Sequence, residues 1–262
     1  GQATPYEMGK EASGVVFEKG PSAQGFEVGD SVIVVKFNNG CYGEKVAAEP
    51  GQLLAPPDGF SFAEMAAFGN TWATAWLALD EMGRVRPGES ALIQAAAGGV
   101  GTAAVALARS MGMGPIIGTA GGEKKCRLVE ELGADRCVDY RTEDFREAVS
   151  EVTEGRGVDW CLESVGGEVY ERSLDALGST GRLVVIGFSS LEGNYAEQIP
   201  RLHPLTLFHR SIAVAGLNVD ELDYPTLPGC WDGLVEHVNR HGLRPVLGPS
   251  FSFSDIAAAH AS

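Results

Sequence analysis

The stretch Ser90–Arg109 constrains the fold more than any other part of the chain. A short apolar run leads through Gly98, Gly99 and Gly101 into an alanine-rich segment. A buried strand that feeds a glycine turn and then a helix is typical of a dinucleotide pyrophosphate site, because glycine lets the backbone approach the phosphates and the first helical N–H groups are unpaired. Glycines also fill tight turns for steric reasons alone, but the flanking strand and helix favour binding. The residues predicted to form this turn are Ala95, Gly98, Gly99, Val100 and Gly101.

From Leu92 onward, short apolar runs alternate with amphipathic segments at the spacing of right-handed βαβ units. This alternation predicts an α/β fold with a doubly wound parallel sheet of six strands. The strands are expected near Leu92 and over residues 115–119, 136–139, 158–163, 181–187 and 211–217, with helices over 100–111, 123–132, 143–152 and 168–177.

The segments on either side of this alternation have other patterns. Close-spaced short strands at 11–17, 31–36 and 42–48, followed by a proline-rich connection at 53–59, predict a small β-barrel. Helices are expected at 62–68 and 71–80, broken at Gly69-Asn70, and later at 231–240 and 255–260, with extended pieces near 245–247 and 251–253. We divide the chain into 1–70, 71–217 and 218–262. The chain starts without methionine and stops inside an unfinished helix, so we expect a missing segment at each end.

Composition excludes several classes of function. The formal net charge of −15 argues against nucleic acid and anionic membranes as partners, while a local basic pocket can still hold a phosphate. The five cysteines are scattered and form no C-x-x-C pair, which argues against a disulfide framework and a cysteine zinc site. We find no signal peptide and no membrane-spanning run, and we expect a cytoplasmic protein with reduced thiols.

A β-rich segment, a Rossmann domain and a return to the first domain together resemble the medium-chain dehydrogenase/reductase superfamily. The detailed motifs are similar to its zinc-independent NADPH:quinone oxidoreductase branch. The resemblance implies a Rossmann sheet plus a partial GroES-like β-rich catalytic domain. It rests on Gly9–Val16, Val28–Val32, Gly69–Ala75, Ala95–Gly101, Leu132–Asp135, Glu163–Gly167 and Gly181–Gly187.

The chain departs from the zinc-dependent relatives at Lys10. Those relatives have Gly-His-Glu at this place, with the histidine as a metal ligand, whereas this chain has Gly9-Lys10-Glu11. An ammonium has no lone pair for zinc, and no cysteine lies near Gly69. The histidines show no ligand spacing either, so we expect no metal; they are His203, His209, His237, His241 and His260.

The second predicted strand bears on the choice of nicotinamide cofactor. NAD-specific Rossmann domains have an Asp or Glu about twenty residues past the glycine turn. Here the strand ends in small residues that include Thr119 and Gly122, which we predict to line the cofactor site. The resemblance implies that Lys125 and Tyr140 hold the 2′-phosphate of NADPH, while Lys124 is expected to be solvated and Glu123 could point either way.

The nicotinamide end is expected where the later strands finish, at the carboxyl edge of the sheet. Backbone groups there can bind the carboxamide, and the candidates are Ser164, Gly187, Phe188 and Ser189. Thr71 resembles the family threonine that contacts the cofactor at the domain junction. Asn218 is a weaker candidate that could simply end the sixth strand.

The reaction that these patterns favour is hydride transfer from NADPH to a quinone or another electron-poor small molecule, with no catalytic residue assigned. One alternative is an enoyl reductase acting on acyl thioesters or alkenals, which needs a proton source. Tyr42 and Lys10 are present, but the sequence does not show that either points into the cleft. A further alternative is a non-catalytic NADPH-binding protein. The apolar edge strand Ser211–Leu217 favours a homodimer through this strand.

Overall fold

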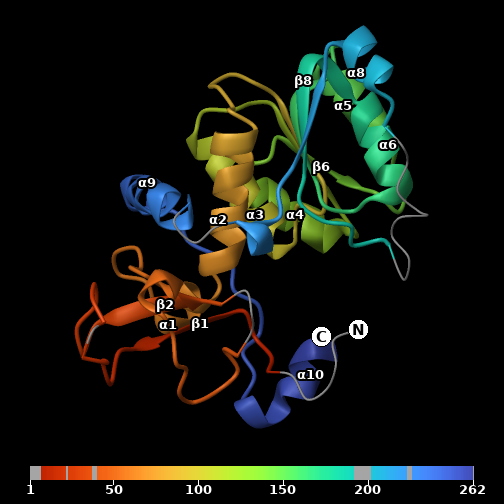
Figure 1. Cartoon of the computed structure of the whole chain (residues 1–262). Coiled ribbons are helices and arrows are strands. Elements are labelled where there is room, and N and C mark those ends of the chain that lie inside the picture. The colour runs from red at the N-terminus through yellow and green to blue at the C-terminus, as the bar shows by residue number, and fades with distance from the viewer. Residues whose placement is uncertain (1–6, 22, 37–39, 192–201, 223–225, 262) are drawn as a thin grey trace.

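Two separate sheets organise the described part of the chain, one antiparallel and one parallel (Figure 1). The computed structural model describes residues 7–21, 23–36, 40–191, 202–222 and 226–261. Helices lie on both sides of the larger sheet, and a long helix connects it to the smaller sheet. The predicted α/β fold is confirmed. No helix within the described ranges combines the length and the apolar character needed to cross a membrane.

The larger sheet has six parallel strands in the spatial order β6-β5-β4-β7-β8-β9. Chain order reverses between β4 and β7, and in such sheets ligands bind beyond the carboxyl ends at the reversal. The predicted doubly wound topology is therefore confirmed. The strands are β4 (Ala91–Ile93), β5 (Ile116–Ala120), β6 (Arg136–Asp139), β7 (Val158–Glu163), β8 (Leu177–Val185) and β9 (Ala213–Gly216).

Strand β4 shows how the sequence pattern builds the layers. Ala91 and Ile93 face the core beneath α2 and α3, whereas Leu92 faces the core beneath α5 and α6. Successive strand residues point to opposite faces, so an uninterrupted apolar run suits a strand that is covered on both sides. The covering helices are α2 (Gly69–Leu77), α3 (Gly99–Ser110), α4 (Glu123–Glu131), α5 (Phe145–Val152) and α6 (Gly167–Asp175).

The smaller sheet is antiparallel and has the order β1-β2-β3, with β1 at Glu11–Val15, β2 at Ser31–Val35 and β3 at Leu53–Leu54. Within the described residues it forms an open three-stranded sheet, so the predicted barrel is not closed there. The predicted strand at 42–48 is wrong, because this segment joins no described strand: the Tyr42 N–H donates to the Met8 carbonyl, and the Ala47 carbonyl accepts a side-chain bond from Lys36. The predicted connection at 53–59 contributes β3, after a 3-10 turn at Pro50–Gln52.

Two helices connect the sheets. Helix α1 (Phe62–Ala66) begins at a capping box in which Ser61 and Glu64 satisfy each other's backbone N–H groups. The predicted break between two helices is present, but it lies at residues 67–68 and not at Gly69-Asn70: α2 begins at Gly69 and continues as a π-helical turn over Ala78–Met82. The Glu11 carboxylate accepts the Asn70 N–H at 2.8 Å, and this bond satisfies one of the free donors of the first turn.

Helix α9 (Thr226–His241) brings the C-terminal part of the chain back to the smaller sheet and packs against α2. Trp231 lies 5.4 Å from Phe68 between ring centroids, and its indole N–H donates to the Ala55 carbonyl at 2.8 Å. Helix α10 (Ile256–Ala261) follows a 3-10 turn at Phe253–Asp255. The proposed division at residue 70 stays a prediction, and α2 runs across it.

The extended pieces expected near 245–247 and 251–253 pair with no described strand, and Ser252 has an extended backbone. Two further expectations need correction. Strand β8 starts at Leu177, so the helix predicted up to that residue ends at Asp175. A short helix, α8 (Pro204–Arg210), was not predicted, because it has no buried stripe that would produce a periodic pattern.

Candidate cofactor-binding site

The glycine turn lies directly beyond β4, at the carboxyl edge of the parallel sheet. Ala95 has a left-handed backbone with φ of 49°, and its carbonyl accepts the Gly98 N–H at 2.9 Å. Gly98 precedes α3 and has no side chain that could cap the helix. The first N–H groups of this twelve-residue helix are therefore available to an anion, and the helix dipole favours one.

The glycines of the turn differ in what they allow. A Cβ added at Gly101 would lie 2.7 Å from the Ala96 Cα, so only glycine lets α3 pack this closely on the turn. A Cβ added at Gly99 would lie 3.0 Å from the Thr71 methyl group. The predicted turn residues and Thr71 therefore lie side by side, and Val100 begins α3 between the two glycines. The surface formed by this turn and the α3 N-terminus suits a pyrophosphate group.

A buried polar network supports the turn from beneath. The Thr119 hydroxyl donates to the Gln94 side-chain oxygen at 2.6 Å and accepts the Ala95 N–H at 3.2 Å. The Gln94 amide donates to the Ser173 hydroxyl at 2.9 Å. Thr119 is only 2% exposed. Its side chain therefore positions the turn and does not face the space above it.

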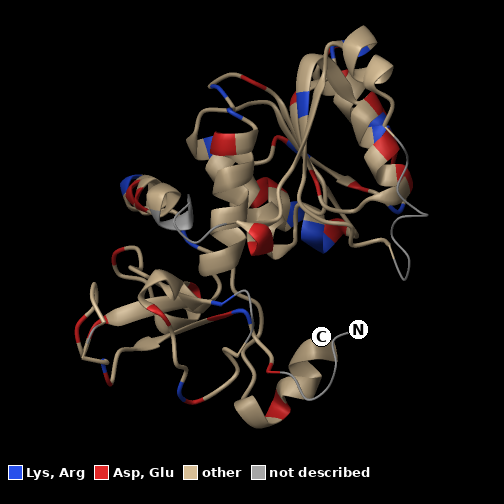
Figure 2. Cartoon of the chain, in the orientation of Figure 1, with Lys and Arg blue, Asp and Glu red and all other residues tan. Residues whose placement is uncertain are grey.

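The end of β5 meets the end of β6 at a patch of small and basic residues. Gly122, with φ of 97°, precedes α4, and Lys125 is exposed in the first turn of that helix. A Cβ at Gly121 would lie 2.6 Å from the Tyr140 hydroxyl and 3.2 Å from the Arg141 guanidinium, so both side chains cover this turn. Figure 2 shows the basic residues of α4 at this end of the sheet.

Some charged side chains of this patch form ion pairs and others do not. The Glu123 carboxylate forms an ion pair with Arg127 at 2.5 Å, one turn further along α4. Its side chain therefore points along the helix surface. Lys125 and Arg141 enter no ion pair with any described residue. No carboxylate stands at the end of β5, where Ala120 is followed by Gly121. Two uncommitted cations and the Tyr140 hydroxyl are suited to a phosphate monoester.

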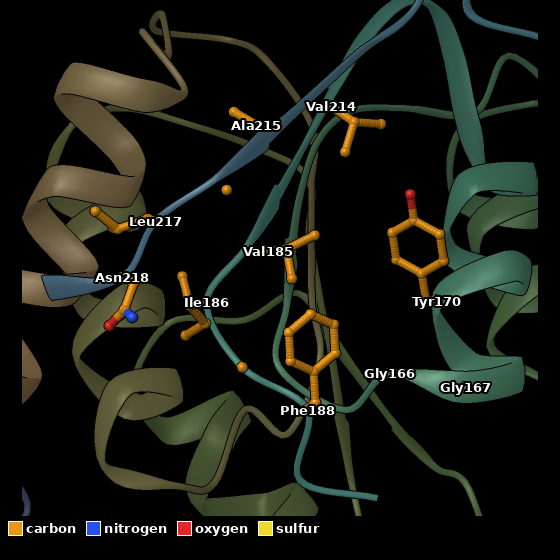
Figure 3. A pocket seen from close by; sticks show the side chains of 12 residues that line it. Gly166, Gly167, Tyr170, Val185, Ile186, Phe188, Val214, Ala215, Leu217 and Asn218 are labelled. Atoms are coloured by element: carbon orange, nitrogen blue, oxygen red, sulfur yellow. The ribbon is translucent and has the colours of Figure 1, made fainter. Parts of the chain in front are cut away.

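The loops after β7 and β8 are tied together beside the reversal point. The Ser189 N–H donates to the Ser164 carbonyl at 2.9 Å. An apolar cavity of about 600 Å³ opens next to these loops, and Gly187 and Phe188 line it. In Figure 3 the rings of Phe188 and Tyr170 flank one side of this cavity. Of the predicted nicotinamide residues, Gly187 and Phe188 line this recess, whereas Ser164 and Ser189 lie in the loops beside it.

Asn218 lies at the other side of the recess, near Ile186 (Figure 3). Its side-chain oxygen accepts the Asp220 N–H at 3.2 Å and caps the 3-10 turn η3 (Val219–Glu221). Asn218 thus follows β9 and lines the cavity, and its contact with the cofactor stays a prediction.

Comparisons with known proteins identify the family. The model of the zinc-binding dehydrogenase family matches residues 99–236. Quinone oxidoreductase-like protein 2 of Rattus norvegicus is 34% identical over 96% of this chain and 71% of its own length. The chain belongs to the medium-chain dehydrogenase/reductase superfamily, in its quinone oxidoreductase branch.

Other relatives of this superfamily are much longer or solved in three dimensions. A mycocerosic acid synthase-like polyketide synthase of Mycobacterium tuberculosis is 35% identical over 81% of this chain, and the match spans only 10% of that synthase. The JamJ enoyl reductase matches with a TM-score of 0.84 and 26% identity over 98% of this chain and 75% of its own. A mycobacterial protein complexed with NADPH matches with a TM-score of 0.87 and 26% identity over 99% of this chain and 80% of its own.

Several residues of this superfamily member were missed by sequence reasoning. Arg141 follows Tyr140 directly, and only the fold shows that its guanidinium covers Gly121 and Gly122. Gln94 and Ser173 are 79 positions apart in the chain, so their contact has no local signal. Glu163 is 0% exposed, and its carboxylate accepts the Val165 and Gly166 N–H groups at 2.8 and 2.9 Å.

Glu163 makes the stability of the chain depend on pH. Burial raises its pKa above the ordinary value, although the backbone N–H groups of Gly166 and Val165 oppose the shift. The folded chain thus holds this proton more tightly than the unfolded chain. The stabilisation from this group is complete below the ordinary carboxyl pKa of about 4.3 and is lost as the pH rises through the raised value.

We therefore expect Glu163→Gln to remove this decline while keeping an oxygen that accepts the loop N–H groups. The free energies of unfolding of both proteins, measured with urea from about pH 4 to about pH 8, should diverge in favour of the variant as the pH rises. A difference that stays constant across this range would contradict the assignment.

Proposed function

We propose that this chain is the reductase part of an enzyme that transfers a hydride from NADPH to a quinone or another electron-poor acceptor without a metal ion. The observation that carries this proposal is the pairing of an uncapped glycine turn at β4 with uncommitted cations at the end of β5. Bound NADPH would supply the hydride, while the protein orients both reactants and excludes water.

The residues present fit this cofactor. Gly98 leaves the α3 N-terminus without a side-chain cap, Gly101 lets this helix pack on the turn, and Lys125 with Arg141 offers two cations to a 2′-phosphate. The neighbour complexed with NADPH supports a nicotinamide cofactor, and the two cations support NADPH over NADH. The backbone groups around Ser164 and Gly187 lie next to the apolar recess, where a flat ring is shielded from water.

Independence from zinc is supported by two features. No cluster of three or more histidine, cysteine or acidic side chains forms within the described residues. Lys10 precedes Glu11 where the zinc-dependent relatives have a histidine ligand, and its ammonium pairs with Asp220.

The five cysteines, all free thiols, support a reducing, cytoplasmic setting.

An enoyl reductase is the second candidate, because structural neighbours have that name and several relatives are polyketide synthases. We would assay the full-length protein with NADPH against quinones, 2-enoyl thioesters and alkenals. Quinone turnover alone supports the first proposal, and faster turnover of enoyl substrates favours the second. Tight NADPH binding with no acceptor reduced would contradict both and leave a non-catalytic binding protein.

The exposed edge of the parallel sheet supports a homodimer. Among the described strands β9 pairs only with β8, and neighbouring α8 exposes Leu205 and Phe208, the latter by 76%. An unpaired apolar edge strand tends to be covered or paired. We expect sedimentation at micromolar concentration to show a dimer, and a monodisperse monomer would contradict this prediction.

A further inference from the structure

Lys10 and Asp220 form an ion pair that bridges the two sheets. Lys10 directly precedes β1 of the small sheet, and Asp220 lies in η3, which follows the edge strand β9 of the parallel sheet. The two residues are 210 positions apart in the chain. Asp220 is two positions past Asn218, which lines the apolar recess. The ammonium group therefore lies near the mouth of the proposed hydride-transfer site.

The backbones of both residues are fixed, while their side-chain ends remain accessible. The Lys10 carbonyl accepts the Lys36 N–H at 2.7 Å, and the Asp220 N–H is held by the Asn218 side chain. The Lys10 and Asp220 side chains are 41% and 36% exposed. A small molecule can thus reach the ammonium group, while the small sheet fixes the backbone position from which the Lys10 side chain extends.

The pair itself contributes little to stability. Ion pairs with this much exposure contribute about 0–1 kcal/mol, so a role as a latch between the sheets would be a weak one. The same low value means that one ammonium hydrogen can turn to another oxygen at little cost. An ammonium has three donors, and one carboxylate does not use all of them.

The other described polar groups of this region offer no full positive charge. The Thr71 hydroxyl donates to the Ala67 carbonyl at 2.7 Å, and the Glu11 carboxylate accepts the Asn70 N–H. The Tyr42 ring lies 5.9 Å from the His260 ring between centroids and contacts Gly9. Among these described residues, Lys10 alone combines a full positive charge with donors to spare.

We propose that the Lys10 ammonium binds the carbonyl oxygen of the acceptor and that Asp220 is only its exchangeable partner while no acceptor is bound. This inference rests on the proposed function and adds a substrate-contacting residue to it. When a conjugated carbonyl acceptor takes up a hydride, an electron pair moves onto its oxygen. The ammonium donates a hydrogen bond to that oxygen as the charge develops, and water supplies the proton that completes the product.

The test compares Lys10→Met, Lys10→Arg and Asp220→Asn in the full-length protein. Removing one donor to a developing oxyanion costs about 100-fold or more in turnover. We expect Lys10→Met to lower kcat for the acceptor by about 100-fold. Lys10→Arg should restore most of the rate. Asp220→Asn breaks the same ion pair but keeps the ammonium, and it should stay within about tenfold of wild type.

A binding readout separates this inference from the proposed function. 4-Nitrophenolate has the charged oxygen of a reduced acceptor, and its binding in the presence of NADP⁺ is followed by its absorbance. Lys10→Met should weaken this binding at least tenfold, and Asp220→Asn should not. Equal effects of Lys10→Met and Asp220→Asn, on rate or on binding, would show that the ion pair only holds the two sheets together and would overturn the assignment. A Lys10→Met variant with unchanged rate and binding would overturn it as well. A wild-type protein that reduces no acceptor overturns the proposed function, while the phenolate titration still decides the role of Lys10.

Discussion

Gly101→Ala is expected to weaken NADPH binding by about 100-fold and to lower the free energy of unfolding by about 1–3 kcal/mol. The new methyl group would lie 2.7 Å from the Ala96 Cα and 2.8 Å from its carbonyl carbon, both backbone atoms that cannot turn away. Helix α3 must therefore move away from the turn, and its first N–H groups would no longer be positioned to bind the phosphates. Fluorescence titration of NADPH and urea denaturation measure the two effects.

Gly233→Ala is the matched control, because Gly233 also lies in a helix, α9. A Cβ there would meet only Trp76, at an ordinary contact distance of 3.5 Å. Alanine stabilises a helix interior by about 1 kcal/mol relative to glycine, so this variant should be as stable as wild type or more so, with unchanged NADPH affinity. Tight NADPH binding by Gly101→Ala would contradict the placement of the pyrophosphate at this turn.

The double variant Lys125→Ala/Arg141→Ala is expected to weaken NADPH binding by about 30- to 100-fold and to leave NADH binding unchanged. A hydrogen bond to a charged group contributes about 1.5–3 kcal/mol, and exposure places each of these at the low end or below. Only the 2′-phosphate distinguishes the two cofactors, so a loss confined to NADPH locates that phosphate. Dissociation constants for both cofactors give the ratio.

Arg127→Ala provides the control for charge alone. Arg127 lies on the same helix, but its guanidinium is paired with Glu123. This variant should keep NADPH affinity within about threefold of wild type, the range expected for an exposed pair. A double variant that weakens NADPH and NADH equally would show that Lys125 and Arg141 do not contact the 2′-phosphate.

The parallel sheet and its turn were predictable because their signals are local. An apolar run such as Ala91–Ile93 suits a strand covered on both faces, and a glycine pattern at its end is a feature of neighbouring residues. The segment 42–48 has similar alternation yet forms no strand. Strand formation also depends on a partner, and here no described strand pairs with it. Alternation alone cannot supply that information.

The sequence predicted the parts of the candidate site that consist of consecutive residues, such as the glycine turn. It did not predict the contacts between residues that are far apart in the chain. Gln94 and Ser173 support the turn from the end of β4 and from α6, and Lys10 beside the small sheet pairs with Asp220, which follows the parallel sheet. Such contacts follow from topology, which brings separate loops to one edge of the sheet. Thr119 shows the converse: its position was predicted, but burial gives it a supporting role beneath the turn.

The oxidation of NADPH by the full-length protein, with and without a quinone and with NADH in parallel, tests the central claim most directly. We predict that NADPH is consumed only when the quinone is present, one molecule for each quinone reduced, and that NADH is used at least about tenfold less efficiently, the effect of one charge-assisted hydrogen bond. Equal use of both cofactors would contradict the phosphate site at Lys125 and Arg141. Absence of turnover with quinone and enoyl acceptors alike would contradict the assignment as a reductase.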